Sequence, residues 1–137
     1  MIGQLLLVGV LLIQAVSHGV ATYALIKDAS QMESQPPVPV RAWLLPSLSN
    51  RVSAAIALVF WLLATVGYLA SAMSLSGSLL PAGTWQPLAI AASLVSTLGI
   101  VFFSGIWPGA PNRKLAKIDT VIALILNVVL LVFALMG

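Results

Sequence analysis

Four long apolar stretches alternate with short, more polar segments along the chain. They cover residues 2–26, 52–73, 85–106 and 118–136. Each is close to the roughly 20 helical residues needed to cross a bilayer. The runs are continuous rather than alternating, and Leu and Ala dominate them, which favours helices over barrel strands. The pattern predicts an all-α, polytopic membrane protein, in which residues 1–137 form one antiparallel four-transmembrane-helix bundle.

The first stretch has the alternative interpretation of a secretory signal peptide. Such a peptide starts with a basic segment, whereas residues 1–4 carry no basic side chain. The apolar run is also longer than the core of a signal peptide. We therefore expect 2–26 to be a mature transmembrane helix.

Composition narrows the class of protein further. The chain is 61% hydrophobic and 7% charged, with a mean hydropathy of +1.11, whereas soluble domains carry roughly 25% charged residues. This argues against a soluble domain, a disordered chain and a nucleic-acid-binding module, so no nucleic acid partner is expected. Cysteine is absent, which removes disulfides, thiolate metal sites and thiol nucleophiles.

The basic residues predict the topology. All six lie in the segments between the first and second stretches and between the third and fourth: Lys27, Arg41, Arg51, Arg113, Lys114 and Lys117. The connection at 74–84 has no charge. Since basic loops stay in the cytoplasm, we expect loop 27–51 to be cytoplasmic, with both termini and 74–84 outside.

The aromatic residues and the first loop complete the predicted membrane arrangement. We expect Trp85 at the outer interface and Tyr23 and Trp107 at the inner one, as an aromatic belt. Residues 29–39 are polar and Pro-rich, which is typical of an extended linker. The apolar stretch 40–48 is short and contains a proline, so we expect an interfacial segment rather than a fifth span.

Small residues recur at intervals of four on three of the stretches, which predicts close helix packing. The residues are Ala15 and Gly19, Gly67 and Ser71, and Ala89, Ser93 and Thr97.

Little in the stretches points to catalysis. Apart from tyrosine, His18 is the one titratable side chain well inside them, and there is no carboxylate pair or histidine cluster. A Ser-His-Asp site would need Asp119, which lies at the cytoplasmic start of the fourth stretch, whereas His18 lies ~12 Å below the surface. We therefore expect no catalytic residue and no metal site, and an enzyme is the function with least support.

His18 belongs to a polar stripe on the first helix. Gln14, His18 and Thr22 follow one another at intervals of four, which places them on one helical face. A functional interpretation is a ligand contact, an axial ligand to a haem-type or chlorophyll-type cofactor, or a proton-coupled step. The interpretation we favour is a neutral histidine that is hydrogen-bonded to a neighbouring helix, and the cofactor stays unknown.

Two amides are expected at the middle of the bilayer. Gln14 is the midpoint of 2–26 and Asn127 that of 118–136. A lipid-facing amide there would lack hydrogen-bond partners, so we predict that both point inward. They would bond each other or Thr65, Ser96 or Thr97. With His18, they could also line a small pocket for the polar head of an apolar ligand.

Several short segments resemble small bacterial membrane proteins of the DoxX type. They are Ser17-His18-Gly19-Val20-Ala21, the segment 60–68 (FWLLATVGY), Trp85-Gln86-Pro87-Leu88-Ala89, Ile106-Trp107-Pro108 and Ile118-Asp119. The resemblance covers most of the chain except the first loop. It implies four helices in a bacterial inner membrane and implies no reaction.

Two functions remain in view beside the enzyme. The first is a structural or accessory subunit that packs in a membrane complex, through other subunits or by self-association, in contact with the lipid bilayer. The alternative is binding or transport of a small apolar ligand, a lipid or a quinone, near His18. Its candidate ligand-binding residues are Gln14, His18, Thr22 and Asn127.

Overall fold

The structure is a computed structural model that describes residues 2–30, 44, 46–103 and 106–136. It contains four α-helices and one short 3-10 turn, η1, and no strand within these residues. The helices are α1 (Ile2–Ser30), α2 (Asn50–Leu75), α3 (Trp85–Phe102) and α4 (Arg113–Met136), with η1 (Ala82–Thr84) before α3. Each of the four is long and apolar enough to cross a membrane. The predicted all-α, multi-pass four-helix bundle is confirmed.

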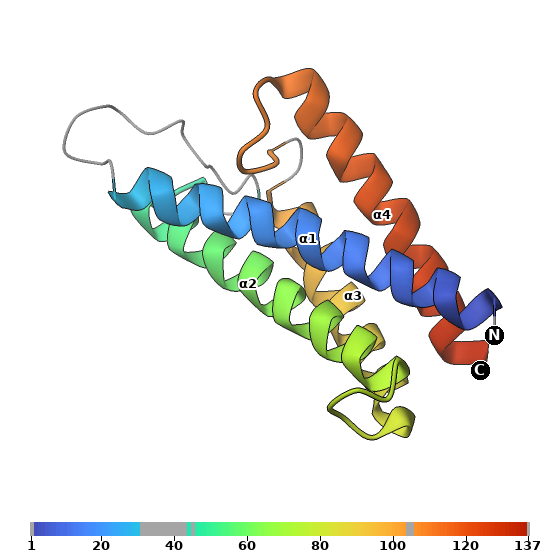
Figure 1. The fold of residues 1–137 in the computed structure, drawn as a ribbon. Helices are drawn as coiled ribbons and strands as arrows, with labels where there is room; N and C mark the ends of the chain where they lie inside the picture. Colours follow the sequence, from blue (N-terminus) through green and yellow to red (C-terminus); the bar gives the residue numbers. More distant parts are fainter. Residues whose placement is uncertain (1, 31–43, 45, 104–105, 137) are drawn as a thin grey trace.

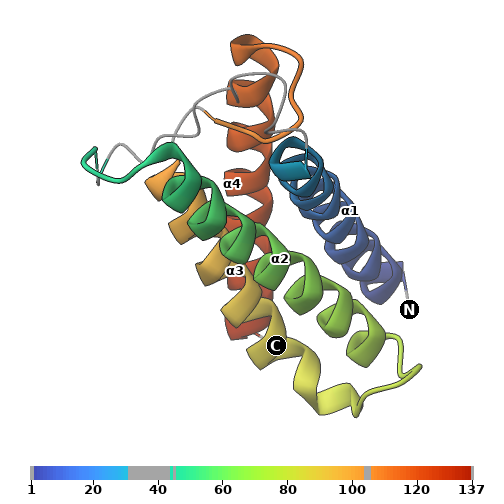
Figure 2. The ribbon, with the colours of Figure 1, turned by 90° about the vertical axis from the view of Figure 1, so that its left-hand side faces the viewer.

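The helices run up and down, as Figure 1 shows. Both chain ends lie at one end of the bundle with the α2–α3 connection, and the end of α1 and the starts of α2 and α4 lie at the opposite end. In sequence order each helix packs against the next, whereas α1 and α4 touch over a shorter region. In both views α4 crosses α1 at an angle instead of running alongside it (Figures 1 and 2).

The charged residues gather at one end of this bundle. Five of the six basic residues are described, and they lie in the last turn of α1, the first turn of α2 and the first two turns of α4: Lys27, Arg51, Arg113, Lys114 and Lys117. Arg41 lies outside the described residues. The α2–α3 connection at the opposite end carries no charge, so the fold keeps the charge asymmetry on which the predicted topology depends.

The helices differ in length from the apolar stretches at their polar ends. α4 begins at Arg113 rather than 118, because the Asn112 side chain accepts a hydrogen bond from the Leu115 backbone N–H at 2.9 Å and caps the helix. α1 continues through Lys27 to Ser30, whose hydroxyl donates to the Lys27 carbonyl at 2.7 Å. Hydropathy marks the part of a helix that lies in lipid, and these charged turns extend beyond it.

The end of α3 was predicted wrongly. We expected it near 106, and it ends at Phe102. The Phe103 N–H still donates to the Gly99 carbonyl, but Phe103 leaves the helical conformation, with φ −116° and ψ 38°. The helix therefore ends at Phe102, earlier than Pro108 alone requires.

The interior contains two apolar clusters with a polar layer between them. One cluster lies toward the termini: Leu11, Ala15, Ala64, Tyr68, Ala72, Ala89, Ala92, Leu130 and Ala134. The other lies toward the charged end: Ala21, Leu25, Ala57, Trp61, Ile100, Phe103, Trp107, Ala116 and Ala123. Many members are alanine, which lets the helix backbones approach closely.

α2 and α3 approach each other closely at Gly67. A Cβ atom placed on Gly67 would lie 2.8 Å from the Ala92 Cβ, well inside van der Waals contact. The expected role of small residues in helix packing is confirmed at this crossing. Most of the predicted linker and interfacial segment of the first loop, including Trp43, lies outside the described residues.

Candidate functional site

The polar residues singled out from the sequence meet at the centre of the bundle. Gln14 and His18 on α1 and Asn127 on α4 are each 1% exposed. The prediction that the two amides point inward is confirmed. So is the prediction that they bond each other, because the Gln14 Nε2 donates to the Asn127 Oδ1 at 2.6 Å.

Asn127 connects all four helices. Its Oδ1 accepts hydrogen bonds from Gln14 of α1 and from the Tyr68 hydroxyl of α2, the latter at 2.5 Å. Its Nδ2 donates to two hydroxyls of α3, those of Ser96 at 2.9 Å and Thr97 at 3.1 Å. An amide offers two N–H donors and one oxygen with two lone pairs. All four capacities of Asn127 are therefore used.

Gln14 joins α1 to α4 through two contacts. Besides the bond to Asn127, its Nε2 donates to the backbone carbonyl of Ala123 at 3.2 Å. Ala123 lies one turn before Asn127, so one amide group spans a whole turn of α4. Both N–H bonds of Gln14 are used, which stabilises the α1–α4 crossing at this depth.

The partners of His18 define its tautomer. The ring Nδ1 lies 2.9 Å from the Gln14 carbonyl oxygen, which can only accept, so Nδ1 carries a proton. The Nε2 lies 2.7 Å from the Ser96 Oγ. Since Ser96 already accepts from Asn127, its own proton can go to His18. A neutral ring with the proton on Nδ1 thus suits both hydrogen-bond partners of His18.

Aromatic rings complete the surroundings of His18. The Tyr68 ring centroid lies 5.4 Å from the imidazole and the Trp107 centroid 5.2 Å, the latter in an edge-on arrangement. The expectation that Trp107 belongs to the interfacial belt is therefore wrong. Its side chain is 6% exposed and also contacts the Trp61 ring at 5.9 Å.

The burial of Trp107 depends on the turn that it begins, in which the Ala110 N–H donates to the Trp107 carbonyl. α3 ends early, and Gly109 adopts a φ of +83° so close to α1 that an added Cβ would lie 3.0 Å from the Ala24 Cβ. This turn packs against α1 and directs Trp107 into the bundle. Tyr23, the other residue expected at the inner interface, has an exposed side chain, as a belt position requires.

Thr22 does not join the polar network. Its hydroxyl donates to the carbonyl of His18 on the same helix at 2.8 Å. Thr65, another expected partner, likewise bonds the Trp61 carbonyl one turn back. Tyr68 is the member that sequence reasoning missed. A tyrosine deep in a span needs a hydrogen-bond partner for its hydroxyl, and this requirement could have predicted that Tyr68 joins the network.

Ser96 and His18 are hydrogen-bonded to each other, as the nucleophile and base of a hydrolase are. The Ser96 hydroxyl faces the imidazole, as in an activated nucleophile, but a backbone carbonyl stands where a carboxylate would orient the ring. Ser96 is 3% exposed, and its oxygen already accepts from Asn127. A substrate would have to displace these contacts, so the arrangement is better suited to holding helices together.

Other polar atoms and cavities lie outside this network. Within the described residues no three His, Cys, Asp or Glu side chains are close enough to hold a metal ion. Three buried atoms lack a hydrogen-bond partner there: the Ser53 Oγ, the Trp61 Nε1 and the Ser93 Oγ. Cavities of about 580 Å³ and 210 Å³ lie between α1 and α2 and between α1 and α4. Neither is lined by the predicted ligand-binding residues.

No protein-family model, curated protein or solved structure matches the chain. The resemblance to DoxX-type proteins stays a prediction.

Proposed function

We propose that this protein is a structural or accessory subunit that packs within a larger complex of the bacterial inner membrane. The observation that carries the proposal is the saturation of Asn127, whose four hydrogen bonds reach α1, α2 and α3. The central polar groups are used to fix the four helices in one arrangement. In membranes, hydrogen bonds and close packing rather than the hydrophobic effect hold helices together.

The outer faces support the same role. Large apolar side chains cover the outside of the helices and are exposed in the isolated chain; the most exposed on α4 are Val121, Ile125, Val128, Phe133, Leu135 and Met136. In the membrane these side chains contact lipid or another subunit. Because Gln14, His18 and Asn127 have their partners inside the bundle, these outer faces can be apolar where they meet a partner.

The proposed orientation places the charged end in the cytoplasm and both termini outside. The position of Lys27, Arg51, Arg113, Lys114 and Lys117 at one end supports it, since basic residues beside spans are retained on the cytoplasmic side. The inner membrane of a bacterium is what the sequence resemblance implies.

Ligand binding at His18 has less support. Both ring nitrogens already have protein partners, so a lipid or quinone head would have to replace Ser96 or the Gln14 carbonyl. Such a ligand would also have to separate the rings of Tyr68 and Trp107 from the imidazole.

Site-specific crosslinking tests the proposal directly, because the chain contains no cysteine. Single cysteines at Val66 on α2 and Val128 on α4, which are 56% and 59% exposed, probe two outer faces of matched exposure. A packing subunit should purify in mild detergent with a partner of defined stoichiometry and crosslink to it in the membrane from one face only. A monomer that crosslinks from neither position, or that retains a small molecule lost in His18→Ala, would contradict the role.

A further inference from the structure

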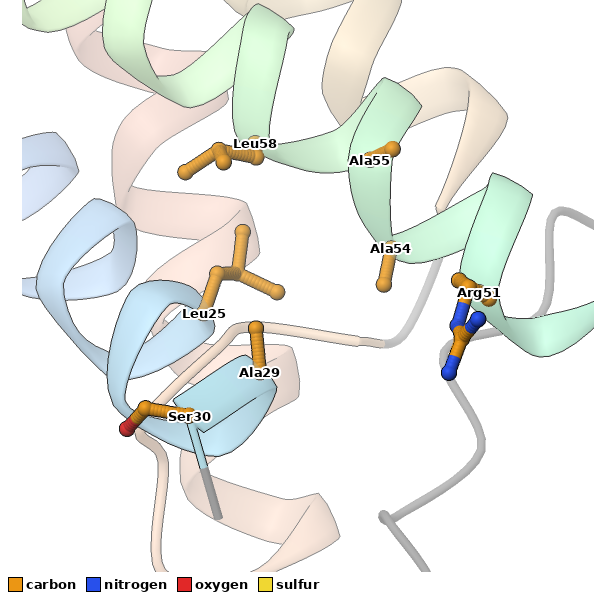
Figure 3. A pocket seen from close by; sticks show the side chains of 7 residues that line it. All are labelled: Leu25, Ala29, Ser30, Arg51, Ala54, Ala55 and Leu58. Carbon is orange, nitrogen blue, oxygen red and sulfur yellow. The ribbon is translucent and has the colours of Figure 1, made fainter. Parts of the chain in front are cut away.

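The larger cavity lies where α1 ends and α2 begins, away from the central network. Seven residues line its volume of about 580 Å³: Leu25, Ala29 and Ser30 from α1, and Arg51, Ala54, Ala55 and Leu58 from α2. In Figure 3, Leu25 and Ala29 face Ala54 and Leu58 across the space, and Arg51 stands at the start of α2. The volume lies within the range of small-molecule sites.

Polarity changes along this cavity in one direction. From Arg51 to Leu58 the wall extends over seven residues of helix, or ~10 Å. Its deep part is formed by leucine and alanine side chains, and its charged group is the Arg51 guanidinium in the first turn of α2. At the charged end of a membrane bundle, this places a cation at headgroup level and an apolar wall at acyl-chain level.

The Arg51 guanidinium is available for an anion. It is exposed and has no ion pair or hydrogen bond within the described residues. The amino end of α2 adds a partial positive charge beside it. The same end of the bundle also carries Lys27 on α1, with Asp28 next to it and not among the cavity residues.

We propose that this cavity binds an anionic phospholipid, with its phosphate at Arg51 and an acyl chain along Ala54 and Leu58. A cation without a partner among the described residues, next to an apolar wall, fits an amphiphile better than a soluble anion, because a soluble anion has no apolar part to contact the wall. The proposal does not depend on the packing role of the protein. The bound phospholipid would belong to the leaflet in which the charged end of the bundle lies.

Native mass spectrometry of the protein released from nanodiscs tests the assignment. The discs contain equal amounts of phosphatidylglycerol, which is anionic, and phosphatidylcholine, which is not. The wild type should retain phosphatidylglycerol preferentially. Arg51→Gln should lower this retention about fivefold, as expected for one basic residue at a membrane surface. Arg113→Gln is the matched control, since Arg113 is an exposed arginine at the same end that does not line the cavity.

A second variant tests the apolar wall with the charge intact. Ala54→Trp should fill the cavity and reduce retention to the level of Arg51→Gln. Val59→Trp adds the same side chain at an exposed position of α2 outside the cavity and should retain lipid as the wild type does. Wild-type retention by either Arg51→Gln or Ala54→Trp would overturn the proposal. In the second case, the headgroup would contact Arg51 without a chain in the cavity.

Discussion

The side-chain nitrogen of Gln14 lies 2.6 Å from the side-chain oxygen of Asn127, although 113 positions separate the two residues in sequence. The contact joins the first and last helices where they cross, and α1 and α4 otherwise share a limited contact region. Without it, little besides the Gln14–Ala123 bond and local packing would hold α4 against α1. The pair therefore determines how the bundle closes.

A double-mutant cycle measures this coupling. Gln14→Ala and Asn127→Ala should each destabilise the bundle, and the double variant should lose less than the sum, because either single change already removes the hydrogen bond between the two amides. We expect a coupling free energy of about 1 kcal/mol, within the range for contacting residues. Unfolding in mixed micelles of mild detergent and dodecyl sulfate, followed by circular dichroism, provides the free energies.

Val128→Ala, which changes an exposed neighbour of Asn127, is the control, and its loss should be additive with that of Gln14→Ala. Additivity of Gln14→Ala with Asn127→Ala as well would show that the bond contributes nothing.

Tyr68→Phe isolates one hydrogen bond of the network. The change removes the hydroxyl that donates to the Asn127 Oδ1 and keeps the ring beside His18. Asn127 still accepts from Gln14, so the expected loss of unfolding free energy is small, about 0.6 kcal/mol. Tyr68→Ala also removes the ring from the core and should cost about 3 kcal/mol or more. Equal losses in the two variants would mean that the ring packing is unimportant.

His18→Ala should leave the protein inserted and folded. The change removes hydrogen bonds to Ser96 and to the Gln14 carbonyl, each worth about 0.6 kcal/mol in a membrane protein. It also opens a space between Tyr68 and Trp107, so we expect a total loss nearer 2 kcal/mol. The glutamine in His18→Gln can form hydrogen bonds and fills part of the space, so this variant should regain part of the lost unfolding free energy. Loss of a purified pigment or metal with His18→Ala would instead identify the histidine as a ligand.

The sequence predicted the helices and the depth of the polar residues, but it did not predict their lateral neighbours. Helical rise and span length place Gln14 and Asn127 at one level, and the absence of water there requires them to find partners inside the bundle. Which helix supplies each partner depends on crossing angles, so Tyr68 was missed. Trp107 was misplaced for a related reason. A tryptophan next to a proline at a span end resembles a belt residue, and its burial depends on the early end of α3 and the turn at Gly109.

Gly67 should tolerate no larger residue. A Cβ at this position would lie 2.8 Å from the Ala92 Cβ, so Gly67→Val must push α2 away from α3. Overpacking of this kind destabilises by about 1–3 kcal/mol. Gly9→Val is the matched control, because no atom lies within 4 Å of the position that its Cβ would take. The same unfolding assay should show a large loss for Gly67→Val and little change for Gly9→Val. The opposite order would mean that the α2–α3 crossing is not as close as described.

The orientation in the membrane can be tested with reporter fusions. Five of the six basic residues lie in the last turn of α1, the first turn of α2 and the first two turns of α4. Arg41 lies between α1 and α2 in the sequence, and the α2–α3 connection has no basic residue. Since positively charged loops are retained in the cytoplasm, a periplasmic reporter should be active when fused at Ser78 or Gly137. A cytoplasmic reporter should be active at Met32 or Asn112. Replacing Arg113, Lys114 and Lys117 with glutamine should lower the periplasmic reporter signal at Gly137. The cytoplasmic signal at Met32 should not change, because Lys27, Arg41 and Arg51 still hold the first loop in the cytoplasm. A cytoplasmic signal at Gly137 in the wild type would leave an odd number of spans and contradict the proposed topology.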